Sequence, residues 1–186
     1  MNFEQVEHGS RLILTGILGE NLPEGMEESP TRMAKAFAEL TKGYTVDISA
    51  LFKVFEHDGK DQIVAFRDMR FVSLCEHHAM VFTGMASVAY LPDKKVIGAS
   101  KIARLVNAHA NRFQLQERIA SDVARDLQEY LSPKGVAVIL QAEHSCMRCR
   151  GVKSESSQMV TSVMTGVFRD NQSSRMEVLS LLGFRQ

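Results

Sequence analysis

Two short segments, far apart in the chain, carry residue types that bind transition metals, and a fold that uses them must bring them together. They are Cys75-Glu76-His77-His78 and His144-Ser145-Cys146. Thiolate and imidazole are ligands that zinc prefers, so Cys75, His78 and Cys146 predict a site for one zinc ion. Three protein ligands leave a fourth position for water, which is typical of catalytic rather than structural zinc.

Composition narrows the class of protein. A chain of 186 residues fits one domain, or one domain with a small appendage. The chain has 22 Lys plus Arg residues and 22 Asp plus Glu residues. Its net charge therefore gives no general attraction to nucleic acid or to a membrane surface. The sequence offers no apolar run of the ~18 residues that a spanning helix needs, and no signal peptide. Three cysteines without framework spacing favour a reducing, cytoplasmic setting.

Periodicity and turn residues predict a mixed α+β chain. We expect a helical N-terminal arm over residues 1–45, with one helix in its first 18 residues and a second that Ser29 caps and that ends before Gly43. A catalytic domain is expected over 46–186, in the order strand-strand-helix-helix-strand-strand. Its strands are predicted at 62–74, 80–91, 135–143 and 158–168, its helix pair from Ser100 and near Gln114, and a terminal helix at 174–182.

The segment after residue 143 is predicted to continue as a strand to Arg150. Alternate residues of a strand share a face, so His144, Cys146, Arg148 and Arg150 should point one way. His144 then serves as an acid–base group near the metal, and a guanidinium lies close to an anionic substrate. Cys149 should point away, although a tight turn would allow a Cys-x-x-Cys redox pair or a closed Cys₃His zinc site.

Basic residues at helix starts predict anion binding. Ser100 as a cap, with Lys101 and Arg104 one turn apart, forms a phosphate cradle at the positive end of a helix. Arg32 and Lys35 repeat this spacing on the second helix. A solvated helix face is the simpler explanation of either pair taken alone.

An amide and a carboxylate open the second helix of the helical pair. Leu115 is expected to face the core and to leave Gln116 and Glu117 free for polar contacts. Guanine presents adjacent N–H donors and a carbonyl acceptor, which such a pair can bind. The alternative is a solvated first turn. His109 lies on an apolar stripe and is expected to be a buried core residue.

The chain resembles the GTP cyclohydrolase I family from about residue 20 to the C-terminus. The segments that carry the resemblance are Glu28-Ser29-Pro30-Thr31-Arg32-Met33-Ala34, Ser73-Leu74-Cys75-Glu76-His77-His78, Gly98-Ala99-Ser100-Lys101-Ile102-Ala103-Arg104, Gln114-Leu115-Gln116-Glu117-Arg118, Glu143-His144-Ser145-Cys146-Met147, Arg150-Gly151-Val152 and 161–168. They occur in the order found in that family.

The resemblance implies roles for the candidate residues. Zinc would bind Cys75, His78 and Cys146, and protons would be handled by His144 and His77. Guanine would contact Gln116 and Glu117, and the ribose-triphosphate end would contact Ser100, Lys101, Arg104 and Arg150. A neighbouring subunit would bring Arg32 and Lys35. Ser100 and Gln116 are also counted among the catalytic residues.

The resemblance further implies the tunnelling fold (T-fold), a homodecamer with sites between subunits, and GTP as substrate. The implied reaction opens the imidazole ring of guanine with water, releases formate and rearranges the ribose to give 7,8-dihydroneopterin triphosphate. Such a product supplies tetrahydrofolate, biopterin or 7-deazaguanine synthesis, and the resemblance does not choose among them.

Two other functions are weighed against this one. The first is a tunnelling-fold relative with different purine or pterin chemistry, which the presence of both Cys-x-x-His and His-x-Cys disfavours. The second is a non-catalytic, zinc-stabilised or regulatory nucleotide-binding protein. Formate release from GTP distinguishes all three.

Overall fold

The computed structural model describes residues 1–58 and 61–184. Contacts divide the chain into two compact units, residues 1–42 and 43–186, which are described separately. Within the described ranges, none of the helices combines the length and the apolar character that crossing a membrane requires.

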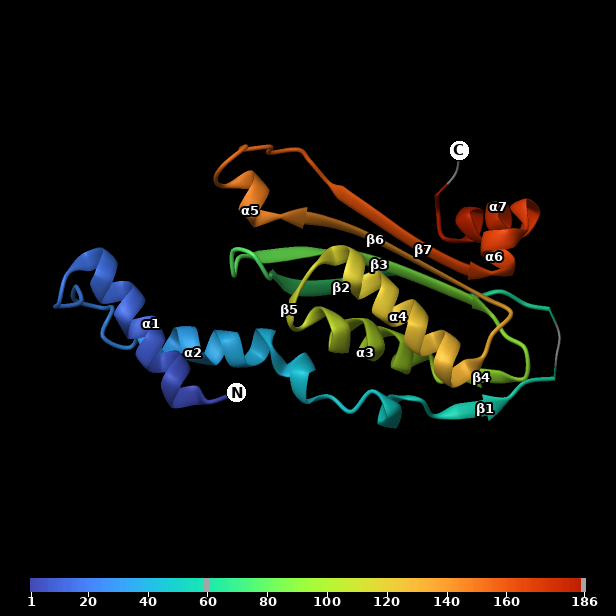
Figure 1. Ribbon diagram of the computed structural model, residues 1–186, viewed down its shortest axis with the longest axis horizontal. Helices are drawn as coiled ribbons and strands as arrows, with labels where there is room; N and C mark the ends of the chain where they lie inside the picture. The colour runs from blue at the N-terminus through green and yellow to red at the C-terminus, as the bar shows by residue number, and fades with distance from the viewer. Residues whose placement is uncertain (59–60, 185–186) are drawn as a thin grey trace. The chain divides into compact units, whose positions relative to one another are not determined.

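The first unit is a pair of helices, α1 over Phe3–Leu18 and α2 over Ser29–Leu40 (Figure 1). The Thr31 hydroxyl of α2 donates a hydrogen bond to the Glu7 carboxylate of α1 and so ties the two helices together. Both helices were expected from their apolar periodicity.

Two details of the predicted helix boundaries are wrong. Ser29 is the first residue inside α2 rather than its cap, and Glu28 occupies the N-cap position. Gly43 is buried in a 3₁₀ turn over Lys42–Thr45 instead of following the helix directly. A Cβ atom there would lie 2.3 Å from the Ala108 carbonyl oxygen, so close packing requires this glycine.

The second unit is built on a five-stranded sheet with the spatial order β5-β2-β3-β6-β7. The strands are β2 Val64–Cys75, β3 Val81–Leu91, β5 Phe113–Gln114, β6 Gly135–His144 and β7 Met159–Gly166. The four long strands are antiparallel, and β5 runs parallel to β2.

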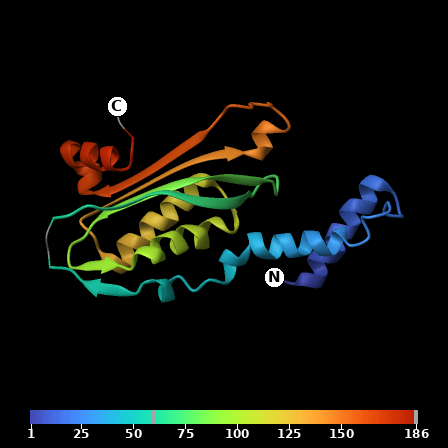
Figure 2. The same cartoon turned by 180° about the vertical axis from the view of Figure 1, so that it is seen from behind.

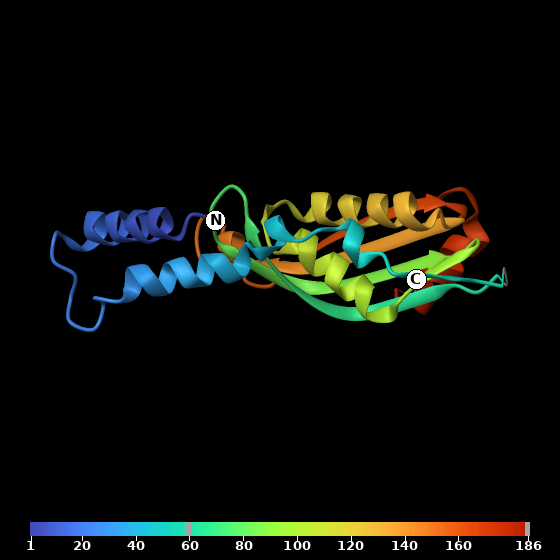
Figure 3. The same ribbon diagram turned by 90° about the horizontal axis from the view of Figure 1, so that it is seen from below.

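Helices α3 (Ala99–Ala110) and α4 (Gln116–Leu131) cover one face of this sheet (Figures 1 and 3). Side chains alternate between the faces of a strand, and the even-numbered β6 residues Val136, Val138 and Leu140 are buried against these helices. The odd-numbered Ala137 and Ile139 face the other way.

The opposite face is covered near one end by two short helices. Phe168 of α6 (Val167–Asp170) and Val178 of α7 (Gln172–Leu181) pack on Ala137 and Ile139. β6 is thus buried on both faces, which explains its nearly continuous apolar sequence. α5 (Ser145–Arg148) and the helices α6 and α7 lie at opposite ends of β6 and β7 (Figure 2).

Several short elements were not predicted. β1 (Val54–Glu56) and β4 (Lys95–Ile97) pair as a separate two-stranded sheet. Along the chain, β4 follows β3 and precedes α3, and β5 separates α3 from α4. α5 separates β6 from β7. The last strand was expected to reach residue 168, but it ends at Gly166, whose φ of +51° turns the chain into α6.

Candidate metal centre and active site

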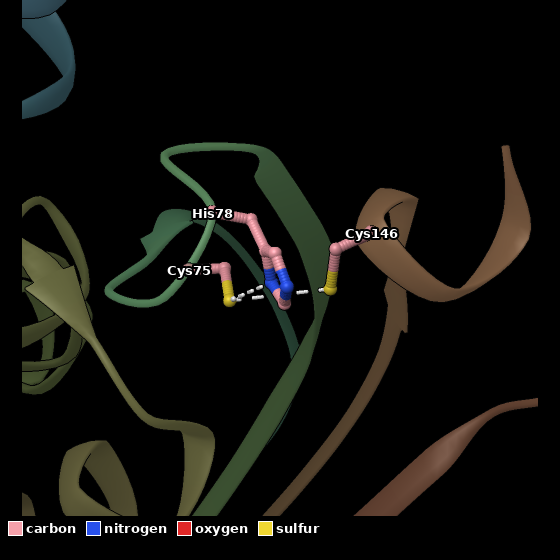
Figure 4. A group of neighbouring side chains, drawn as sticks. All are labelled: Cys75, His78 and Cys146. Carbon is pink, nitrogen blue, oxygen red and sulfur yellow. Dashed lines mark hydrogen bonds between the residues drawn. The ribbon is translucent and has the colours of Figure 1, made fainter. Parts of the chain in front are cut away.

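Three ligand atoms from two distant segments converge at one end of the sheet (Figure 4). Cys75 ends β2, His78 lies in the turn before β3, and Cys146 lies in α5. The Cys75 Sγ atom is 3.5 Å from His78 Nδ1 and 3.9 Å from Cys146 Sγ. All three ligand atoms lie within 4.8 Å of one another, as the metal-ligand motifs predicted.

These separations match the edges of a zinc tetrahedron. Bonds of about 2.3 Å to sulfur and about 2.0 Å to nitrogen, at tetrahedral angles, place two sulfur atoms ~3.8 Å apart and sulfur ~3.6 Å from nitrogen. Two thiols and one imidazole are also a soft donor set that suits zinc. Burial and the nearby Cys75 raise the pKa of the Cys146 thiol, and a bound cation would oppose this by favouring the thiolate.

Strand register explains why the segments meet. Leu74 pairs with Val81 across the β2–β3 turn, and Phe82 pairs with His144 at the end of β6. The turn after Cys75 and the chain beyond His144 therefore emerge at the same end of the sheet. No local sequence pattern contains this information, because it depends on the pairing of β3 with both neighbours.

His144 is held between an aromatic ring and an amide. Its imidazole stacks on Phe82, with ring centroids 4.3 Å apart and planes 8° from parallel. Its Nε2 atom is 2.9 Å from Gln116 Oε1. Burial lowers the pKa of His144, while the Glu117 carboxylate acts in the opposite direction. The sequence did not predict the contact of Phe82 with His144, because Phe82 has the pattern of an ordinary apolar strand residue.

The prediction that Gln116 is free for a ligand is wrong. Its side chain is only 1% exposed. Its amide nitrogen lies within 3.2 Å of the Leu140 and Met159 carbonyl oxygens and of the Thr161 hydroxyl. Backbone carbonyls only accept hydrogen bonds, so the Gln116 amide oxygen must face His144. Gln116 thus links His144 to the sheet.

The predicted strand from His144 to Arg150 is also wrong. β6 ends at His144, and Ser145–Arg148 forms one helical turn. Arg148 therefore pairs with Glu143 instead of sharing a face with His144. The exposed Cys149 donates its thiol hydrogen to the Ser145 carbonyl and is not among the converging ligand atoms. Cys149 was expected to point away from the cluster, and it does. The reason given for this, a continuing strand, is wrong.

Three further candidates lie near the cluster. Glu117 and Arg150 are exposed, and their charges act on His144 and Cys146 respectively. His77 is exposed, with its Nε2 atom 3.9 Å from Glu76 Oε1. Its ring meets the His78 ring edge-on at a centroid distance of 6.1 Å.

The phosphate-cradle candidates of α3 lie apart from the metal cluster within the second unit. β4 lies at the opposite end of the sheet from α5 (Figure 1), and Ser100 and Lys101 lie in the first turn of α3, which follows β4. The twelve residues of α3 span roughly 18 Å, and Arg112 just beyond α3 bonds to Leu74 beside Cys75, so Arg104 lies closer to the cluster than Ser100 does. Ser100 lies inside α3, and Gly98 is the N-cap. In the helical arm, Arg32 pairs with Glu28 at 2.8 Å, and Lys35 is exposed.

His109 is buried, as predicted. It lies between α3 and α4, with its Nε2 atom 2.6 Å from Asp126 Oδ2 and its Nδ1 atom 3.7 Å from Asp122 Oδ2. Arg125 pairs with both aspartates. This charged cluster connects the two helices and is separate from the metal cluster.

Comparisons with known proteins identify the family of this chain. The family described as GTP cyclohydrolase I matches residues 6–183. A protein of Gloeobacter violaceus named GTP cyclohydrolase 1 is 45% identical over 173 residues, which are 92% of this chain and 81% of that protein. Proteins with the same name from Caldanaerobacter subterraneus subsp. tengcongensis and Alkalilimnicola ehrlichii are 40% and 45% identical. They align over 98% and 96% of this chain and 98% and 97% of their own lengths.

Among solved structures, the apo form of the archaeosine synthase QueF-Like aligns with a TM-score of 0.48 and 19% identity. The alignment covers 57% of this chain and 96% of that one. At that TM-score the likeness supports no conclusion about fold or chemistry. The family model and the named relatives match nearly the whole chain. This chain therefore belongs to the GTP cyclohydrolase I family.

Proposed function

We propose that the chain is a zinc-dependent GTP cyclohydrolase I that converts GTP and water into 7,8-dihydroneopterin triphosphate and formate. The observation that carries this proposal is the convergence of two thiols and an imidazole beside the half-buried His144, in a chain of this family. Opening the imidazole ring of guanine is a hydrolysis, and it needs an activated water and a proton donor for the departing ring nitrogen.

Cys75, His78 and Cys146 would hold the zinc ion. When bound, zinc supplies Lewis acidity for the hydrolytic steps. The described residues offer these three converging ligands and no fourth, so the metal keeps a position open. The cysteines are free thiols, as metal binding requires, which supports a cytoplasmic, reducing setting.

His144 would move the protons. Because Gln116 accepts from Nε2, the neutral imidazole keeps Nδ1 without a hydrogen, and this nitrogen can exchange protons with water and substrate. Nδ1 would take a proton from the water that attacks C8 and pass it to the purine nitrogen that leaves C8 when the ring opens. It would then accept a proton during hydrolysis of the formyl group. His77 is a second proton carrier at the mouth of the site.

Glu117 is the residue that we assign to the guanine base. Its exposed carboxylate can accept from the adjacent N–H groups of guanine, and its charge acts on His144, which supports a role beside the proton carrier. Gln116, by contrast, has no free amide group for the base, and we assign it to His144.

We also propose that each complete site forms between copies of the chain in a tunnelling-fold homo-oligomer, with the family's decamer as the expected state. Ser100 and Lys101 begin α3, about the 18 Å length of that helix away from the strand beside Cys75, which favours their serving the site of another copy. A second copy would supply this cradle, and the arm would supply Arg32 and Lys35. Arg150, near Cys146, would meet the same triphosphate.

Formate release from GTP tests the proposed function. The purified zinc-loaded protein should release one formate per GTP, and little from ATP. Chelation should stop the reaction, and His144→Ala should lower kcat about 10²–10⁴-fold while retaining zinc. Absence of formate from a zinc-loaded oligomer would contradict the proposal and favour a non-catalytic nucleotide-binding role.

A further inference from the structure

Glu76 lies between the metal-site residues Cys75 and His77, and its carboxylate is engaged by another element. Arg118 of α4 approaches it with two nitrogen atoms, NH1 at 2.5 Å from Oε2 and NH2 at 3.3 Å from Oε1. The Glu76 side chain is 28% exposed and that of Arg118 is 47% exposed. A two-point guanidinium–carboxylate pair fixes orientation as well as distance.

The backbone joins the same two regions. β2 and β5 pair Cys75 with Gln114, and the Glu76 N–H donates to the Gln114 carbonyl at 3.2 Å. Arg118 NH1 also donates to the Gln114 side-chain oxygen at 3.2 Å. Arg118 therefore holds both the metal-binding turn and the strand next to it.

The rest of the turn is held mainly by hydrogen bonds between its own backbone groups. The N–H groups of His78 and Ala79 both bond to the Cys75 carbonyl, and the Cys75 N–H bonds to the Met80 carbonyl. Ala79 has a φ of +53°, which costs energy for a residue with a side chain. Within the described ranges, the contacts of Glu76 are what tie this turn to α4.

We propose that Arg118 is a positioning residue of the metal centre, which holds the Cys75–His78 turn in its metal-binding conformation through Glu76. This inference rests on the proposed function, because it assumes that the cluster binds zinc. A turn already ordered loses less conformational entropy when the metal binds. The same contact joins the metal ligands to the first turn of α4, which carries Gln116 and Glu117.

The experiment measures metal affinity rather than turnover. Zn²⁺ dissociation constants are obtained by competition with a chromogenic chelator, and Co²⁺ binding is followed through its sulfur charge-transfer absorption. Arg118→Gln and Glu76→Gln should each weaken Zn²⁺ binding about tenfold, as expected when groups that orient metal ligands are removed. Arg118→Lys keeps the charge without the two-point geometry and should fall between these variants and wild type.

Two matched variants separate positioning from general stability. Arg125→Gln removes a multiply paired arginine from the same helix, away from the turn, and should lower the melting temperature without changing metal affinity. The exchanged pair Glu76→Arg/Arg118→Glu should recover binding to within about threefold of wild type.

Each outcome decides one question. Metal affinity within twofold of wild type in both Arg118→Gln and Arg118→Lys would overturn the positioning role. A tenfold loss in Arg125→Gln would also overturn it, because any lost ion pair on α4 would then suffice. Failure of the wild-type chain to bind Zn²⁺ would instead contradict the proposed function.

Discussion

The Nε2 atom of His144 lies 2.9 Å from the Oε1 atom of Gln116, whose amide nitrogen faces two backbone carbonyl oxygens and a hydroxyl. This arrangement leaves one possible direction for the Gln116 amide and therefore one hydrogen-bonding role for the neutral imidazole, donation from Nε2. In the proposed mechanism, the catalytic proton would then move through Nδ1.

We expect Gln116→Leu to lower kcat at least tenfold while zinc content stays at one per chain. The substitution removes the acceptor that selects the imidazole tautomer, and it removes the side-chain donor to the Leu140 and Met159 carbonyls. Loss of such hydrogen bonds should also lower the folding free energy by about 1 kcal/mol or more. The measurements are formate release, metal analysis and the ¹⁵N shifts of His144.

Thr161→Val is the matched control for Gln116. It removes one contact of the same amide but leaves both carbonyls and the bond to His144. Turnover should stay within about threefold of wild type. Full activity in Gln116→Leu would show that His144 needs no fixed tautomer.

Cys75→Ala should lose stoichiometric zinc and activity, whereas Cys149→Ser should keep both. Cys75 contributes a sulfur atom to the converging ligand set, and the Cys149 thiol instead donates to the Ser145 carbonyl. Metal analysis and X-ray absorption should find two sulfur ligands per zinc ion in wild type. Loss of zinc in Cys149→Ser, with a third sulfur ligand in wild type, would make the site a closed one.

Glu117→Ala should raise the dissociation constant for GTP by one to two orders of magnitude, with little change in the already weak binding of ATP. A site built to pair with the N–H groups of guanine discriminates because the wrong base leaves polar groups unmatched. Binding is measured by calorimetry with zinc-loaded His144→Ala protein, which does not turn over. An equal loss for both nucleotides would assign Glu117 a structural role.

Mixed oligomers should recover activity from inactive parents. His144→Ala chains lack the proton carrier, and Lys101→Ala chains lack part of the phosphate cradle at the other end of the sheet. If sites form between copies, some sites in a reassembled mixture contain neither substitution. The same is expected for Arg32→Ala mixed with His144→Ala. No recovery in mass-verified mixed oligomers would place all these residues in one chain's site.

Asp126 should make stability depend on pH at the acid end. Burial alone raises its pKa, but hydrogen bonds and charge from His109 and Arg125 outweigh burial, so the pKa is lowered in the folded protein. Its unfolded value is about 3.9. The contribution of Asp126 is therefore complete above about pH 4 and is lost as the pH falls through the lower folded value.

Asp126→Asn tests this assignment by urea unfolding at neutral and acid pH. We expect a loss of about 1–3 kcal/mol at neutral pH, because a buried partner of His109 is weakened, and a smaller difference from wild type at pH 3. Asp122→Asn, whose carboxylate is 3.7 Å from His109, should cost less. Equal losses at both pH values would exclude the ionised Asp126 as the cause.

The sequence by itself determined the residue chemistry and most of the elements. Cysteine and histidine are rare enough in this chain for Cys75, His78 and Cys146 to be singled out by type and spacing as candidate metal ligands, and their ligand atoms do converge. Apolar periodicity identified α1, α2, α3, α4 and the long strands, because burial of one face repeats along the chain. It also identified His109 as a core residue.

Only the tertiary structure decided how the site is assembled. The end of β6 at His144, the burial of Gln116 and the pairing of Glu76 with Arg118 all depend on contacts between distant segments. His144 and Gln116, for example, are 28 residues apart, and Glu76 and Arg118 are 42 residues apart. The prediction that alternate residues after His144 share one face is wrong because it assumes that the strand continues. Nothing local in Ser145–Arg148 marks the helical turn that forms there. The separation of Ser100 from Cys75 follows from the antiparallel course of β3, which carries the chain to the far end of the sheet before α3 begins.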